Sequence, residues 1–148
     1  MDELIQVLDY ALDHGFTVAW DAATHGSGFS NTLGLAVVLE KEIGKMQQAE
    51  KDDFLASAIH REKQISPALR QSLFESYSIT DDHLMHITCR VKDQHGKTFY
   101  YTKNSSGDGI RPTKGYLYAS LPYIRLNTIS FMVHKDAIPA QVRAKLDL

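Results

Sequence analysis

Residues 81–104 read DDHLMHITCRVKDQHGKTFYYTKN and carry the strongest secondary-structure signal in the chain. From residue 85 to residue 91, apolar and polar side chains alternate, which is the period of a half-buried β-strand. Asp93-Gln94-His95-Gly96 is typical of a turn, and Thr98 to Lys103 is rich in β-branched and aromatic residues. The stretch therefore predicts a β-hairpin around which the rest of the fold is arranged.

The turn also predicts which residues of the hairpin face each other. A symmetric four-residue turn pairs Lys92 with Lys97, and therefore Met85 with Asn104. His83 has the same parity as Met85, so His83 and Asn104 are diagonal neighbours on one face, with backbones ~7–8 Å apart. Their side chains can then meet. A histidine oriented by an amide is the base-and-orienter half of a Cys-His-Asn catalytic site.

The elements around the hairpin alternate between helices and strands. Helical spacing and capping residues predict four helices: Asp2 to Leu12, one within residues 40–65, Ser66-Pro67 to near Tyr77, and a closing helix over Ala137 to Leu146. The third of these has Leu69, Leu73 and Phe74 as its apolar face. β-rich runs predict strands over Phe16 to Trp20, Gly115 to Ala119 and Thr128 to His134. The fold class is α+β, with an antiparallel sheet in the C-terminal half and flanking helices.

Length and composition limit the kind of protein. The 148 residues suit one domain spanning 1–148, and 16 Lys+Arg against 18 Asp+Glu leave no basic surface for nucleic acid or anionic membranes. The single cysteine excludes a disulfide framework. The acidic start at Asp2-Glu3 is unlike a signal peptide, and the longest apolar run, Leu33 to Leu39, is too short to span a bilayer. We expect a cytoplasmic protein.

Two other kinds of ligand site are weaker alternatives. Asp81, Asp82, His83 and His86 are four potential metal ligands, but residues three apart on a strand point to opposite faces. Residues 104–109 form a Gly/Ser-rich loop that could present backbone N–H groups to phosphate, although Asp108 lies inside it. His25, in the Gly/Ser-rich loop after the first predicted strand, is expected to be exposed to solvent.

The chain resembles the His/Asn-bearing half of the papain-like cysteine peptidases. The closest match is the aminopeptidase C and bleomycin hydrolase branch, peptidase family C1B. The similarity covers most of the chain and is weakest between residues 32 and 63. The segments that carry it are Asp82-His83 at the start of a strand, Lys103-Asn104-Ser105 at the end of the next, and Gly115-Tyr116-Leu117 beyond them. The resemblance implies the C-terminal half of the papain-like fold, an antiparallel sheet or barrel with flanking helices.

The resemblance also implies roles for individual residues. His83 would be the general base that activates a thiol, and Asn104 would hold its imidazole in orientation. The family's nucleophile lies in a Gln…Cys-Trp segment that this sequence does not contain. Cys89 cannot replace it, because six strand residues place it about 20 Å from His83; its apolar neighbours predict a buried, inert thiol. Ser106 stands where the family has a tryptophan that shields the His–Asn hydrogen bond.

The implied activity is removal of N-terminal residues from peptides by thiol catalysis, without a metal or organic cofactor. We expect the isolated chain to be inactive, because the nucleophile half is missing. Its expected partners are a peptide substrate or a polypeptide carrying the cysteine-bearing half. A free half should expose an apolar patch or cover it by forming a homo-oligomer. The alternative function is a stand-alone, non-catalytic binding module that uses the surface corresponding to the active-site cleft of the peptidases.

Overall fold

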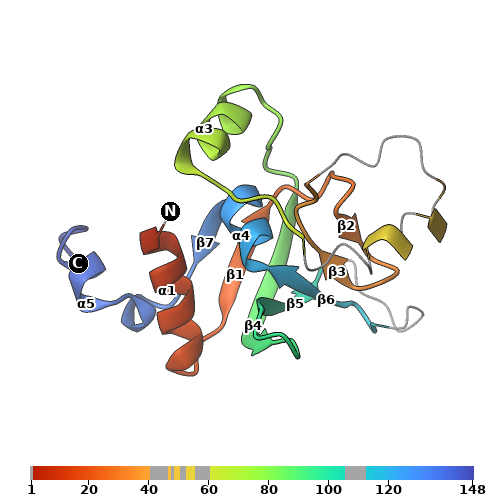
Figure 1. Cartoon of the computed structure of the whole chain (residues 1–148). Coiled ribbons are helices and arrows are strands. Elements are labelled where there is room, and N and C mark those ends of the chain that lie inside the picture. The colour runs from red at the N-terminus through yellow and green to blue at the C-terminus, as the bar shows by residue number, and fades with distance from the viewer. Residues whose placement is uncertain (1, 41–46, 48, 51–52, 56–60, 106–112) are drawn as a thin grey trace.

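A computed structural model describes residues 2–40, 47, 49–50, 53–55, 61–105 and 113–148 (Figure 1). It has the mixed α+β composition that the sequence predicts. Its elements, in chain order, are α1 (Asp2–Asp13), β1 (Val18–Ala22), β2 (Phe29–Ser30), β3 (Leu35–Ala36), α3 (Pro67–Glu75), β4 (His83–Lys92), β5 (Thr98–Asn104), β6 (Tyr116–Ser120), α4 (Leu121–Asn127), β7 (Thr128–Met132), a 3-10 turn (Lys135–Ala137) and α5 (Ala140–Arg143). No helix of these described segments is long and apolar enough to cross a membrane.

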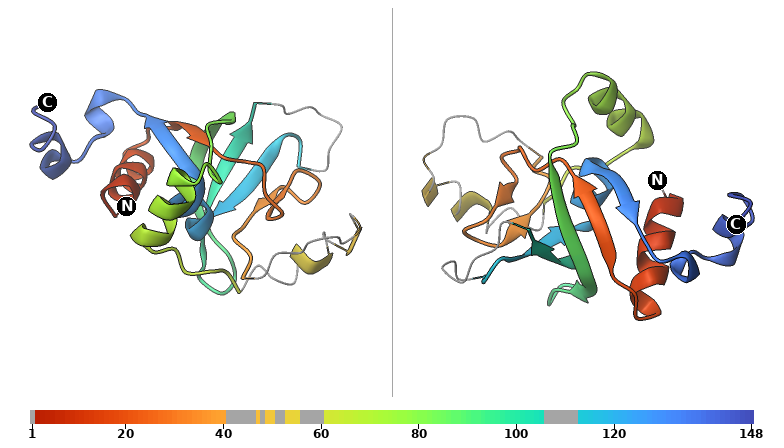
Figure 2. Two further views of the ribbon diagram at one scale, coloured as in Figure 1. Left: turned by 90° about the horizontal axis from the view of Figure 1, so that it is seen from above. Right: turned by 180° about the vertical axis from the view of Figure 1, so that it is seen from behind.

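The strands form one seven-stranded open sheet in the order β2-β3-β6-β5-β4-β1-β7. Every neighbouring pair is antiparallel except β3 and β6, which run parallel. The sheet therefore includes N-terminal strands that the sequence did not predict as part of it, and β1 lies between β4 and β7. Seen from behind, β4 and β1 cross the open side of the sheet without a covering helix (Figure 2).

The first strand starts two residues later than the sequence predicts. Gly15 has a positive φ of 80°, and the amide of Phe16 still donates to the carbonyl of Ala11 at 2.9 Å. Phe16 therefore closes the end of α1, and extended pairing begins only at Val18. Gly15 ends the helix in a left-handed turn, and the hydrogen bond of that turn takes up the next residue as well.

The β4–β5 register contains an irregularity that changes the face of one predicted residue. Near the turn, Lys92 pairs with Thr98 rather than Lys97, so the connection is one residue longer than predicted. A β-bulge between Ile87 and Cys89 compensates, and beyond it Met85 pairs with Asn104 as predicted. The bulge also turns Cys89 outward. The prediction of a buried thiol is therefore wrong, because Cys89 is exposed.

The core lies between the sheet and helices α1 and α4. Helix α1 contributes Ile5, Leu8 and Ala11 from one face, and the sheet contributes Trp20 and Ile87, among others. Helix α4 was not predicted, although its start carries a recognisable signal. The hydroxyl of Ser120 accepts from the amide of Tyr123, and Pro122 lies in the first turn.

Two predicted helices differ from the structure. Helix α3 begins after the Ser66 cap as predicted, but none of its residues is buried, and Phe74 is 47% exposed. Its apolar face is therefore not a core face. The closing helix over Ala137 to Leu146 is replaced by a 3-10 turn and the four-residue α5, because Pro139 interrupts the run and starts the second piece. In the predicted helix within residues 40–65, residues 49–50 and 53–55 are helical, and most of the rest lies outside the described residues.

Candidate functional site

Three strand ends meet at the candidate site. His83 is the first residue of β4 and pairs with Ala22, the last residue of β1. Asn104 is the last residue of β5 and pairs with Met85. Because residues two apart on a strand share a face, His83 lies on the same face as the buried Met85. The site is therefore at the rim of the core, where a side chain can be rigidly held and still reach solvent.

The His83 and Asn104 side chains are hydrogen-bonded to each other. His83 Nε2 lies 2.6 Å from Asn104 Oδ1, and Asn104 Nδ2 donates to Asn31 Oδ1 at 2.9 Å. Asn104 is only 3% exposed, and its backbone amide donates to the carbonyl of Gly115. Because Asn104 Oδ1 can only accept, the proton of neutral His83 is on Nε2. The lone pair on Nδ1 is then free to take a proton.

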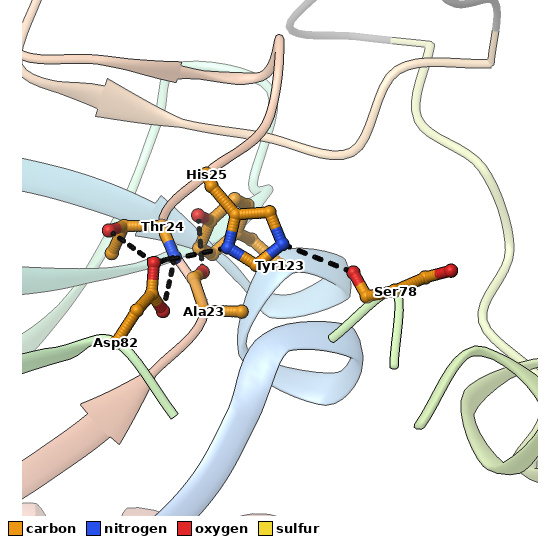
Figure 3. A network of polar contacts seen from close by, with 6 residues as sticks. All are labelled: Ala23, Thr24, His25, Ser78, Asp82 and Tyr123. Atoms are coloured by element: carbon orange, nitrogen blue, oxygen red, sulfur yellow. Dashed lines mark hydrogen bonds and ion pairs between the residues drawn. The ribbon is translucent and has the colours of Figure 1, made fainter. Parts of the chain in front are cut away.

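A second polar network holds the segment that precedes His83 (Figure 3). The backbone amide of Thr24 lies 3.1 Å from both carboxylate oxygens of Asp82, and the Thr24 hydroxyl adds a longer bond. His25 Nδ1 lies 3.1 Å from Asp82 Oδ2, and His25 Nε2 lies 3.2 Å from the carbonyl of Ser78. The network joins the loop after β1 to both ends of the segment that leads into β4. It therefore fixes the backbone on the N-terminal side of His83.

The pKa values of His25 and Asp82 move apart because of this contact. The hydrogen bond to Asp82 raises the pKa of His25; partial burial opposes this rise, and the bond to the Ser78 carbonyl adds to it. Partial burial alone would raise the pKa of Asp82, but the Thr24 amide and His25 outweigh it, so the pKa of Asp82 is lowered. The prediction that His25 is exposed to solvent is confirmed. Half of its side chain is exposed, yet both of its nitrogens are bonded.

A pair of carboxyl groups lies on the same side of the site. Asp21 on β1 is 7% exposed, and burial, followed by the neighbouring Asp81 carboxyl group, raises its pKa. Asp21 also accepts a weak bond from Ser130 on β7. This bond links β1 to β7 beside the site.

The metal alternative finds no support in the described part of the chain, which contains no group of three or more ligand residues placed to hold an ion. His83 faces the core rim, and His86 bonds to the Thr17 hydroxyl. The two imidazoles diverge as strand geometry predicts. Residues 106–109 of the phosphate-loop alternative, which include Ser106, lie outside the described residues.

Several residues of the site were not predicted. Asn31 has no local motif and lies 73 residues from Asn104 along the chain. It reaches the site because β3 pairs in parallel with β6, which no short-range pattern indicates. Thr24 and His25 carry a weak signal, since a Gly/Ser-rich loop directly after a strand is a common place for a binding surface.

Comparison with known proteins supports the architecture alone. No protein-family model matches the chain, and no curated protein matches it. Among solved structures, the chain is similar to PepW from Lactobacillus rhamnosis HN001 (DR20), with a TM-score of 0.66 and 16% identity. The match covers 99% of this chain and 29% of the PepW chain. The chain therefore shares the fold of one part of PepW and spans less than a third of that protein's length.

Proposed function

We propose that this chain supplies the general base and its orienting amide to the active site of a papain-like cysteine aminopeptidase. The observation that carries the proposal is the 2.6 Å contact between His83 Nε2 and Asn104 Oδ1. Asn104 is almost fully buried, so its amide is held by the protein rather than by solvent. The similarity of fold to one part of PepW and the resemblance of the sequence to the aminopeptidase C branch support this proposal.

In the proposed reaction, Nδ1 of His83 takes the proton of a cysteine thiol. The thiolate attacks the carbonyl carbon of the first peptide bond, and the imidazolium then gives its proton to the departing amine. Water, deprotonated by the same imidazole, hydrolyses the thioester and restores the thiol. Asn104 accepts a hydrogen bond from Nε2–H throughout, which keeps Nδ1 turned toward the reacting groups.

The nucleophile belongs to a segment outside this sequence. The only cysteine is Cys89, which is six residues along the strand from His83 and therefore about 20 Å away. We propose that the partner is a polypeptide, or a further part of the same polypeptide, that carries a Gln…Cys-Trp segment. Exposed large apolar side chains support the need for a partner; Tyr77, Leu84 and Met132 are 84%, 64% and 76% exposed.

The test uses the purified chain and aminoacyl-coumarin substrates under reducing conditions. We expect no hydrolysis by the chain alone, and no change with Cys89→Ser. Hydrolysis that disappears with His83→Ala and with Cys89→Ser would overturn the assignment of the nucleophile to another segment. Reading the coding sequence on either side of the chain for a Gln…Cys-Trp segment identifies the source of the thiol.

The alternative is a non-catalytic binding module. The observation that favours it is a groove of about 510 Å³ between α3 and β7, lined by Phe74, Tyr77, Ile79 and Ile129 among others. The groove also includes Asp81, two residues before His83. If the chain binds peptides there with an affinity that His83→Ala leaves unchanged, the binding module is the better account.

A further inference from the structure

We infer that Asn31 is a positioning residue that selects the orientation of the Asn104 amide and, through it, the tautomer of His83. The inference rests on the proposed function, because only in a catalytic base does the position of that proton matter. Asn31 does not contact His83 in any hydrogen bond of the described residues. It acts through Asn104, whose Nδ2 donates to Asn31 Oδ1 at 2.9 Å.

The position of Asn31 is fixed by the fold and not by a flexible loop. Asn31 follows β2 directly, and the Ser30 hydroxyl accepts from the amide of Leu33, which closes the turn. At the other end of the turn, the carbonyl of Gly34 accepts from the amide of Tyr118 on β6 at 2.8 Å. Since β6 is the neighbour of β5 in the sheet, this bond holds the turn next to the strand that carries Asn104.

Gly34 makes this close approach possible. Its φ is +63°, and a Cβ added there would lie 2.3 Å from the Thr113 side chain and 3.0 Å from the carbonyl oxygen of Tyr116. Only glycine combines that backbone conformation with so little space. The turn that presents Asn31 is therefore packed against residues at the start of β6, which leaves Asn31 little freedom to move away from Asn104.

The chemistry of the carboxamide explains why a partner is needed. An asparagine side chain presents an oxygen on one side and an NH₂ group on the other, and rotating it by 180° exchanges the two. If Asn104 were rotated, its oxygen would face the oxygen of Asn31, and its NH₂ group would face Nε2 of His83. Nε2 would then have to accept, which moves the proton of neutral His83 to Nδ1 and removes the base. With Asn31 presenting Oδ1 as it does in the structure, that arrangement loses the bond between the two amides and is disfavoured, because restoring the bond would require Asn31 to rotate as well.

The experiment is a measurement of the His83 tautomer by nuclear magnetic resonance. Long-range ¹H–¹⁵N correlation spectra of the ¹⁵N-labelled chain, recorded at a pH where histidines are neutral, distinguish Nε2–H from Nδ1–H. His83→Gln identifies its signals. For the unchanged chain we expect the Nε2–H tautomer to dominate. Asn31→Leu removes the acceptor, and we expect the ratio of tautomers to fall by about two- to tenfold, the effect of one net hydrogen bond.

Two further variants make the result specific. Thr32→Val changes an exposed residue of the same turn and should leave the ratio unchanged. Asn31→Asp keeps an acceptor and cannot rotate into a donor, so it should preserve Nε2–H and shift the Asn104 side-chain amide protons downfield, because they then donate to a carboxylate. The indole signal of Trp20, which bonds to Thr128, reports whether each variant is folded.

The possible outcomes separate this inference from the proposed function. An equal tautomer ratio in the unchanged chain and in a folded Asn31→Leu overturns the role of Asn31. If Asn31→Leu does not fold, unshifted Asn104 amide protons in Asn31→Asp overturn it instead. Dominance of Nδ1–H in the unchanged chain contradicts the His83–Asn104 arrangement itself, and therefore the proposed function.

Discussion

The contact between His25 and Asp82 predicts that the stability of the protein depends on pH in one defined range. Nδ1 of His25 faces a carboxylate oxygen, and Nε2 faces the carbonyl oxygen of Ser78. Both partners can only accept, so both bonds form only when the imidazole carries two protons. Loss of one proton therefore breaks one of the two bonds and removes the charge attraction to Asp82.

The direction of the pH effect follows from the two pKa values. Because the pKa of His25 is raised in the folded protein, its contribution is complete below its ordinary value of 6.5 and is lost as the pH rises through the raised value. Because the pKa of Asp82 is lowered, its contribution is complete above its ordinary value of 3.8 and is lost as the pH falls through the lowered value. The pair is therefore fully effective from about pH 4 to 6.5.

The size of the effect is limited by solvent. The side chains of His25 and Asp82 are 50% and 29% exposed, so the interaction resembles an ion pair at the surface. Such pairs contribute about 0.2–1 kcal/mol to the free energy of unfolding. Asp82 also accepts from the backbone of Thr24, so replacing Asp82 alone removes more than this pair.

A double-mutant cycle isolates the pair from that second contact. Urea unfolding of the unchanged chain, His25→Gln, Asp82→Asn and the double variant gives the coupling free energy at each pH. We expect about 0.2–1 kcal/mol at pH 5.5 and a smaller value at pH 9, where neutral His25 keeps at most one of its two bonds and has lost its charge. The effects of all other titrating groups cancel in the cycle. A coupling free energy that is the same at both pH values would refute the requirement for a doubly protonated His25.

Three further predictions concern the exposed thiol, a buried charge and a close backbone contact. Cys89 is exposed, so one equivalent of Ellman's reagent should react with the folded chain before any urea is added; reaction only above the unfolding midpoint would contradict the outward turn at the bulge. Lys97→Met should lower the free energy of unfolding by about 3 kcal/mol, because Glu62, whose side chain is 2% exposed, loses its ion-pair partner. A decrease in the free energy of unfolding below ~1 kcal/mol would show that the pair is not buried. Gly28→Ala should cost about 1–3 kcal/mol or more, because its Cβ would lie 1.9 Å from the carbonyl oxygen of Val37; unchanged urea unfolding would contradict that close approach.

The hairpin could be predicted from sequence because its signals are local. The alternation of apolar and polar residues, the turn sequence and the odd or even position of each residue along its strand were enough to pair Met85 with Asn104 and to predict that His83 and Asn104 meet. The turn itself is one residue longer than predicted, and the pairing is correct only because a bulge near Cys89 compensates. The alternation of apolar and polar residues does not reveal a bulge, so Cys89 was predicted to be on the buried face although it is on the exposed one.

The remaining parts of the site depend on contacts between residues far apart in the chain. Asn31 approaches Asn104 through the parallel pairing of β3 with β6, and strands of two residues are too short for a periodic signal. The amphipathic pattern of α3 was predicted correctly, but a pattern does not say whether a partner covers the apolar side. In this structure Phe74 remains 47% exposed.

The central claim is that the chain carries a working base and orienter and lacks only the nucleophile. A single-chain chimera tests it, with residues 1–148 replacing the His/Asn-bearing half of a cysteine aminopeptidase of the aminopeptidase C branch. In a chimera that unfolds cooperatively, we predict hydrolysis of aminoacyl-coumarins that is lost with His83→Ala and retained with Cys89→Ser. A folded chimera that is inactive, or whose activity does not depend on His83, would contradict the account.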